Sequence, residues 1–406
     1  MVFYTHTFDN GLRIIHHQIP SQVAHCGLYI NAGSRNEKAG EHGMAHFIEH
    51  LMFKGTKKRK AHHIISRLEA VGGEINAYTG KEETCIYSSF LKEDFERSLE
   101  LICDMTFDSI FPEKELAREK QVIIDEIISY RDNPSEQIFD DFEELVFSGD
   151  PIGRNILGTP ANLKGFTRDD VIKFIENNYL TNQMVFSSVG NIEFKNVLKY
   201  AQKHLARIPE NKSPADSNGM VDYTPEFKTV KKRTHQAHCI IGNLSFDLHD
   251  PRRMPMVLLN NILGGPGMSA RLNLALREKS GYAYTIESHF TAYSNTGIFT
   301  VYFGTDREKL DRCRSLVHKE FDGMRKNRIG GMQLNKAKRQ LKGQLTIGWE
   351  NKENLMMAIG KSYLLFNRVD SMQDVYDKID RITADDLLEV ANIVLDPYSL
   401  SELSYI

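Results

Sequence analysis

Residues 43–56 read GMAHFIEHLMFKGT. His46 and His50 are four residues apart, so on a helix their imidazoles lie one above the other on one face. Glu49 lies one residue from that face. Two neutral imidazoles at this spacing can reach one ion, and the pattern HxxEH therefore predicts a zinc site.

A zinc ion held by two imidazoles needs a third ligand and an open position for water, whose pKa the ion lowers towards neutrality. Glu49 is then placed to take the proton of that water as a general base. The alternative is a surface helix in which the pattern arose by chance, since the chain has 15 histidines. The acids further along the chain argue against this alternative.

The third ligand is expected from a second helix, whose candidate is residues 118–128, REKQVIIDEII. Glu119 and Glu126 are seven residues apart, which is two turns along one helical face. They share that face with Val122 and Ile123, and carboxylates that border an apolar stripe need a partner. We expect Glu126 to ligate zinc and Glu119 to support a ligand or handle a proton. The alternative is a pair of ordinary solvated glutamates.

Together with GSRNE at residues 33–37, this motif resembles the pitrilysin/insulinase family of inverted-motif zinc peptidases. The likeness is greatest to two-domain members of the mitochondrial processing peptidase type. In the family the third zinc ligand is a glutamate 76 residues after the second histidine, which is Glu126 in this chain. Glu119 matches the second acid of the family. The resemblance thus implies the same ligand set and a role for Glu119 in catalysis.

Two further segments resemble parts of the family that contact substrate. Asn76, Ala77 and Tyr78 match an edge strand that pairs with an extended peptide, and pairing through main-chain hydrogen bonds tolerates many peptide sequences. Residues 276–284, LREKSGYAY, match a segment whose arginine and tyrosine contact substrate. These residues are Arg277 and Tyr284, for which the alternative is a structural role.

The chain has 406 residues and shows a faint internal repeat. The tripeptide AHC occurs at residues 24–26 and again at 237–239, an offset of 213 residues. A segment rich in turn formers separates the two halves. We predict an α+β fold of two similar domains, each a mostly antiparallel sheet with helices packed on it. The expected division is a catalytic zinc-binding domain at 1–208, a linker at 209–225 and a metal-free domain at 226–406.

Composition excludes several classes of protein. Fifty-one basic and 54 acidic residues give a formal charge of -3, so we expect no nucleic-acid partner. The chain has no 18-residue apolar run and no apolar leader at its start, which predicts no membrane segment. Five cysteines without CxxC spacing favour a reducing compartment. We therefore expect a cytoplasmic protein.

These observations predict a zinc-dependent endopeptidase with one Zn²⁺ per chain, because the second half has no corresponding ligand set. Its substrate is expected to be an extended or unfolded peptide. A homodimer is expected, with Arg277 and Tyr284 acting on the zinc of the other copy. One alternative is a catalytic chain that needs an inactive homologue as a heterodimer partner. The other is a non-catalytic subunit of a processing complex.

Overall fold

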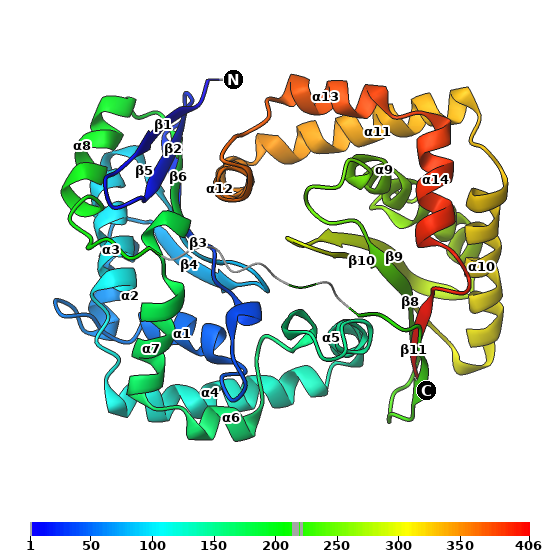
Figure 1. The fold of residues 1–406 in the computed structure, drawn as a ribbon, viewed down its shortest axis with the longest axis horizontal. Coiled ribbons are helices and arrows are strands. Elements are labelled where there is room, and N and C mark those ends of the chain that lie inside the picture. The colour runs from blue at the N-terminus through cyan, green and yellow to red at the C-terminus, as the bar shows by residue number, and fades with distance from the viewer. Residues whose placement is uncertain (1, 213–218, 220–221) are drawn as a thin grey trace. The chain divides into compact units, whose positions relative to one another are not determined.

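The computed structural model describes residues 2–212, 219 and 222–406, which form two compact units (Figure 1). Unit 1 consists of Met1–Ile128, Arg154–Asp216 and Thr346–Ser371. Unit 2 consists of Ser129–Gly153, Ser217–Leu345 and Met372–Ile406. Residues 213–218, 220 and 221 of the expected linker 209–225 lie outside the described residues.

Unit 1 contains a six-stranded sheet with the strand order β1-β2-β6-β3-β5-β4. All its neighbours are antiparallel except β2 and β6. Its strands are β1 Tyr4–Thr7, β2 Arg13–Gln18, β3 Val23–Ile30, β4 Glu74–Thr79, β5 Thr84–Leu91 and β6 Met184–Gly190.

Unit 2 contains a five-stranded sheet with the order β7-β11-β8-β10-β9. Again one pair, β7 and β11, is parallel and the rest are antiparallel. Its strands are β7 Phe227–Val230, β8 Ala237–Ser245, β9 Ala283–Ala292, β10 Gly297–Thr305 and β11 Ser401–Tyr405. The order matches that of unit 1 without β1, so the AHC tripeptides fall on corresponding strands, β3 and β8. The predicted α+β fold with internal duplication is confirmed.

The helices of the first part of the chain are α1 Met44–Met52, α2 Ala61–Glu69, α3 Phe95–Phe107, α4 Glu113–Arg131, α5 Pro134–Val146, α6 Pro160–Gly165, α7 Arg168–Asn178 and α8 Phe194–His204. Those of the second part are α9 Arg253–Gly264, α10 Leu310–Lys326, α11 Gly331–Glu350, α12 Lys352–Phe366, α13 Met372–Arg381 and α14 Ala384–Val394.

The sheet of unit 1 is buried on both faces. Along β6, Met184 and Phe186 face the core that contains α1 and α3, whereas Val185 and Val189 face α12. This follows from the two-residue period of a strand, and it requires an apolar helix on each side. In unit 2, α9, α10 and α14 cover one face of the sheet and α5 covers the other.

The units therefore differ from the expected division at 1–208 and 226–406 in one helix each. Helix α12, from the second half of the sequence, packs on β3 and β6 of unit 1, and α5, from the first half, packs on β8 and β11 of unit 2. The physical reason is that each sheet has a second apolar face, which its own half of the sequence leaves uncovered.

Two sequence features can be checked directly. No helix in the described part of the chain is long and apolar enough to cross a membrane. The five cysteines are buried and unpaired, which fits their role as small apolar side chains.

Candidate metal centre

Helix α1 carries the HxxEH motif and is embedded in the core of unit 1. Its apolar side chains are buried on several sides, and His46 is only 9% exposed. Such a helix has little freedom to rotate or shift, because interiors are closely packed. The backbone thus holds His46 and His50 on one face, with a distance of 4.7 Å between their ring centroids.

The N-terminus of α1 is fixed by a buried acid that the sequence analysis did not single out. The Glu37 carboxylate accepts hydrogen bonds from the backbone N–H groups of Gly43, at 3.0 Å, and Ala45, at 2.9 Å. Gly43 has a φ of 96°, and a Cβ there would lie 2.7 Å from the carbonyl oxygen of Leu157. Only glycine fits this position. The helix that carries both histidines therefore starts at a defined point.

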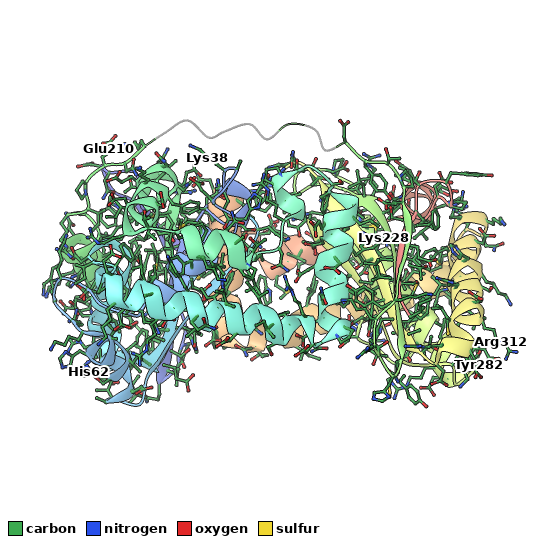
Figure 2. The ribbon with its side chains drawn as sticks, turned by 90° about the horizontal axis from the view of Figure 1, so that it is seen from below. Lys38, His62, Glu210, Lys228, Tyr282 and Arg312 are labelled. Atoms are coloured by element: carbon green, nitrogen blue, oxygen red, sulfur yellow. The ribbon has the colours of Figure 1, made fainter. Side chains whose placement is uncertain are left out.

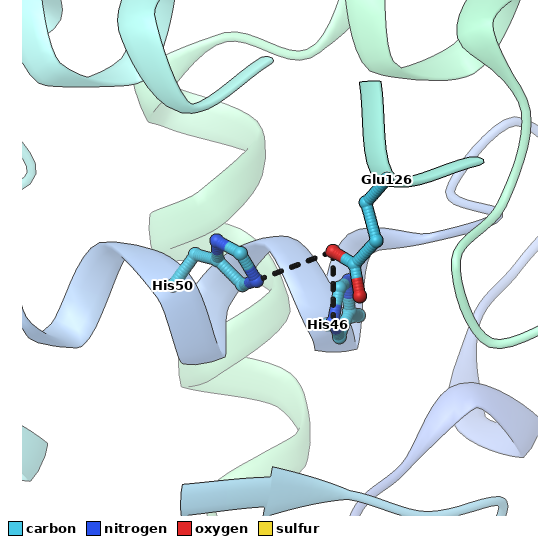
Figure 3. Close-up of side chains that lie close together, drawn as sticks. All are labelled: His46, His50 and Glu126. Atoms are coloured by element: carbon cyan, nitrogen blue, oxygen red, sulfur yellow. Dashed lines mark ion pairs between the residues drawn. The ribbon is translucent and has the colours of Figure 1, made fainter. Parts of the chain in front are cut away.

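Glu126 of α4 faces the two histidines (Figure 3). Its Oε2 lies 4.0 Å from Nε2 of His46 and 3.7 Å from Nε2 of His50. One ligand atom from each residue lies within 4.8 Å of the others, and among the described residues this is the one group found that can hold a metal ion. The structure thus brings together the three predicted ligands from two separate helices.

The donor set fits zinc. Tetrahedral coordination with bonds of about 2.0–2.1 Å sets ligand atoms about 3.3 Å apart. The ligand atoms here lie within 4.8 Å of one another, with Glu126 at 3.7 and 4.0 Å from the two imidazoles, so small side-chain movements bring them to that spacing. Burial, together with the neighbouring His50, lowers the pKa of His46 to about 4. His46 is therefore a neutral imidazole with a lone pair available at neutral pH. Two imidazoles and one carboxylate leave a fourth position for water.

Glu119 is placed behind His50. It is 2% exposed, and its Oε2 lies 3.2 Å from Nδ1 of His50 while its Oε1 lies 2.9 Å from Nζ of Lys54. Burial alone raises the pKa of this carboxyl, but hydrogen bonds from His50 and Lys54 and the charge of Lys54 outweigh burial, so the pKa lies below its ordinary value. Glu119 thus meets His50 as an anion. Lys54 was not among the residues predicted for the site, although its spacing of four residues from His50 is visible in the motif.

Glu49 lies beside the cluster and contacts a strand. Its Oε2 accepts a hydrogen bond of 2.6 Å from the hydroxyl of Thr79 in β4. Burial raises the pKa of Glu49, and the Thr79 hydrogen bond and the nearby His50 oppose this shift. A raised pKa is what a carboxylate needs in order to take up and release protons near neutrality.

The residues Asn76, Ala77 and Tyr78 lie on β4, which is the last strand of its sheet and pairs with β5 alone in the described structure. Helix α1 packs against this strand. The predicted peptide-pairing segment is thus an edge strand next to the metal-ligand cluster.

Arg277 and Tyr284 belong to unit 2. Arg277 lies in the π-helical turn Asn273–Glu278 and is exposed, and Tyr284 of β9 is 69% exposed. Both side chains are accessible from solvent, and Arg277 lies 3.9 Å from the carboxylate of the neighbouring Glu278. Helix α9 packs on the edge strand β9 as α1 packs on β4. The 213-residue offset of the repeat pairs His46 and His50 with Leu259 and Leu263 of α9, which are buried and cannot bind a metal ion.

A further pair of adjacent histidines, His62 and His63, is not part of the metal-ligand cluster. His62 and His63 are exposed on α2, and Figure 2 shows His62 at the surface. Neither belongs to the metal-ligand group found in the described chain.

Sequence comparison identifies the family of the chain. Residues 13–160 match the family described as Insulinase (Peptidase family M16), and residues 165–341 match the one described as Peptidase M16 inactive domain. The ligand cluster lies where these matches predict an active domain, because His46, His50 and Glu126 all fall within residues 13–160.

The alignments with similar proteins cover nearly the whole chain. An uncharacterized zinc protease of Streptomyces coelicolor is 33% identical over 397 residues, covering 96% of this chain and 86% of the relative. An uncharacterized zinc protease of Bacillus subtilis, YmxG, is 30% identical, covering 98% and 97%. The mitochondrial-processing peptidase subunit beta of Saccharomyces cerevisiae is 29% identical, covering 96% and 87%.

Solved structures share the fold. A protease from Helicobacter pylori superimposes with a TM-score of 0.92 at 22% identity, covering 100% of this chain and 99% of that one. A structure from Pseudomonas fluorescens described as a peptidase M16 inactive domain gives a TM-score of 0.92 at 20% identity, covering 100% and 98%. The resemblance found in the sequence is confirmed. The chain belongs to the insulinase family of peptidases, family M16.

Proposed function

We propose that this chain is a zinc-dependent endopeptidase that hydrolyses extended or unfolded peptides. The observation that carries the proposal is the cluster of His46, His50 and Glu126, with Glu49 beside it on the same helix. The names of the zinc protease relatives support the choice of metal.

Each residue of the cluster has a role in this proposal. His46, His50 and Glu126 would hold one zinc ion per chain, which would act as a Lewis acid on the scissile carbonyl and lower the pKa of a water molecule. Glu49 takes the proton of the attacking water and passes it to the leaving amine. Glu119 orients His50 through Nδ1, which leaves Nε2 for the metal.

The substrate class follows from β4. In the described part of the chain no strand pairs with its outer edge, whose N–H and C=O groups can therefore bind the main chain of an added strand. Asn76, Ala77 and Tyr78 would pair with the peptide, so the substrate needs a free extended segment. A folded protein without such a segment is not expected to be a substrate.

For the assembly we propose a homodimer in which Arg277 and Tyr284 of one copy contact the substrate bound at the zinc of the other. Both side chains are exposed on unit 2, and Tyr284 carries a hydroxyl that can donate to the developing oxyanion. The yeast relative named as a subunit supports the tendency to pair. A heterodimer with an inactive homologue is the alternative that a mass measurement of the purified complex distinguishes.

The test uses pairs of peptides that differ in one backbone group. An unfolded peptide should be cleaved by the zinc-loaded chain, spared after chelation and cleaved again when zinc is restored. Backbone N-methylation next to the scissile bond should block cleavage, because a methylated amide cannot donate to β4. Equal cleavage of methylated and unmethylated peptides would contradict strand pairing, and cleavage insensitive to chelation would contradict the metal.

A further inference from the structure

Thr79 is joined to the side chain that is proposed to handle the proton. Its Oγ1 donates to Oε2 of Glu49 at 2.6 Å, and in the described chain no other side chain is found to hydrogen-bond to Glu49. Such a bond fixes one oxygen of a flexible carboxylate side chain and leaves the other oxygen, Oε1, outside this hydrogen bond. The position of Thr79 therefore decides where that oxygen points.

The pleat of β4 explains why Thr79 reaches Glu49. Ile75 and Ala77 pack against the core that contains α1, and Thr79 has the same parity in the strand, so it faces the same side. Tyr78 faces the opposite side and packs against the core formed with α12. A side chain at residue 79 is thus aimed at α1 by the strand itself.

The same strand is the proposed docking edge for the peptide. A strand added to β4 would lie about 4.8 Å from it, in a register set by the main chain of β4. Thr79 belongs to this main chain, and its hydroxyl holds Glu49. The hydrogen bond consequently connects the position of a docked peptide to the position of the carboxylate.

We propose that Thr79 is a positioning residue, which fixes the Glu49 carboxylate relative to β4 and hence relative to a peptide paired with that strand. The inference rests on the proposed peptidase function of this site. In this role Thr79 aligns the Glu49 carboxylate with the substrate and contributes neither to metal binding nor to peptide affinity.

The test compares two substitutions at Thr79. Thr79→Val keeps the shape of the side chain and removes the hydroxyl, so kcat should fall about tenfold to hundredfold while KM and zinc content stay near wild type. Thr79→Ser keeps the hydroxyl and should restore most of kcat. The matched control is Thr84→Val on β5, directly opposite Thr79, whose hydroxyl donates to the carbonyl of Ala32 at 2.8 Å and does not touch Glu49. This control should leave kcat close to that of the wild type.

A binding measurement separates positioning from docking. In the Glu49→Gln background, which is expected not to hydrolyse the peptide, addition of Thr79→Val should leave the Kd of an extended peptide unchanged. A weaker Kd, or a raised KM with normal kcat, would make Thr79 a substrate contact and overturn the inference. So would a Thr79→Ser variant as slow as Thr79→Val, because a hydroxyl at residue 79 would then not be enough to hold Glu49 in a productive position.

The failure of the inference can be told from the failure of the proposed function. If wild-type protein hydrolyses peptides and Thr79→Val does so equally well, only the inference is overturned. If the zinc-loaded wild type hydrolyses none of the peptides, the proposed function is overturned and the inference with it.

Discussion

Oε2 of Glu119 lies 3.2 Å from Nδ1 of His50, the ring nitrogen that faces away from Glu126. This contact fixes the orientation of the imidazole and makes it a better donor to a metal. It also places a buried negative charge behind a proposed zinc ligand, at an atom that is not needed for coordination.

Glu119→Gln should weaken zinc binding about tenfold to hundredfold, because the amide keeps the shape of the side chain and loses its charge. The measurement is a competition titration of zinc against a chelating dye. Glu115→Gln, one turn earlier on α4, is the control and should bind zinc like the wild type. Equal affinities in both variants would show that Glu119 does not support His50.

Glu126→Gln should lose most of its zinc, because the substitution removes the anionic ligand. Metal content after dialysis against trace zinc provides the readout. Asp125→Asn makes the same chemical change at the neighbouring, exposed position and should retain one zinc per chain. The assignment of Glu126 would be refuted by normal zinc content in Glu126→Gln.

His16 should make the stability of unit 1 depend on pH. It has no exposed surface, its Nδ1 lies 2.8 Å from Oγ of Ser188, and its Nε2 lies 2.9 Å from the carbonyl of Ile192. Burial lowers its pKa to about 4, although the bond to Ile192 opposes the shift. Since the ordinary pKa is 6.5, the unfolded chain takes up the proton first as the pH falls, and stability is lost between about 6.5 and 4.

The full effect of this difference is ~3 kcal/mol in the free energy of unfolding. This free energy can be measured by urea unfolding of the metal-free protein at a series of pH values, monitored through the fluorescence of Trp349. The chain has this single tryptophan, and it packs against the core of unit 1. His16→Gln should show a shallower fall over the same pH range. Parallel curves for the two proteins would mean that His16 does not titrate on unfolding.

The homodimer proposal predicts complementation. Glu49→Gln and Tyr284→Phe proteins, each nearly inactive alone, should regain activity after subunit exchange, because one of the two composite sites in the mixed dimer has both intact residues. Mass spectrometry confirms that exchange has occurred. Exchange without recovery would mean that Tyr284 acts on the zinc of its own chain or has no part in catalysis.

The parts of the site that depend on local geometry were accessible from sequence. Histidines four apart share a helix face whatever surrounds them, so His46 and His50 could be paired before the structure was seen. The contact of Glu126 with them crosses between helices and followed only from family resemblance and spacing. The bonds from Thr79 to Glu49 and from Lys54 to Glu119 depend on side-chain packing, and no periodicity encodes them.

The same distinction holds for the fold. The AHC repeat and the turn-rich segment between the halves predicted an α+β duplication, and the common strand order confirms it. The exchange of α5 and α12 between the two units was not predicted. An amphipathic helix shows that it has an apolar face, but its sequence does not tell which of two sheets that face will cover.

The most direct test of the account measures zinc content and peptide hydrolysis on the same samples of wild type and Glu49→Gln. The account predicts one zinc per chain in both proteins, cleavage of an unfolded peptide by the wild type, and no cleavage by the variant, because the amide cannot accept a proton from water. Loss of zinc in Glu49→Gln would make Glu49 a ligand. Undiminished hydrolysis by the variant, or a zinc-loaded wild type that cleaves no peptide, would contradict the central claim.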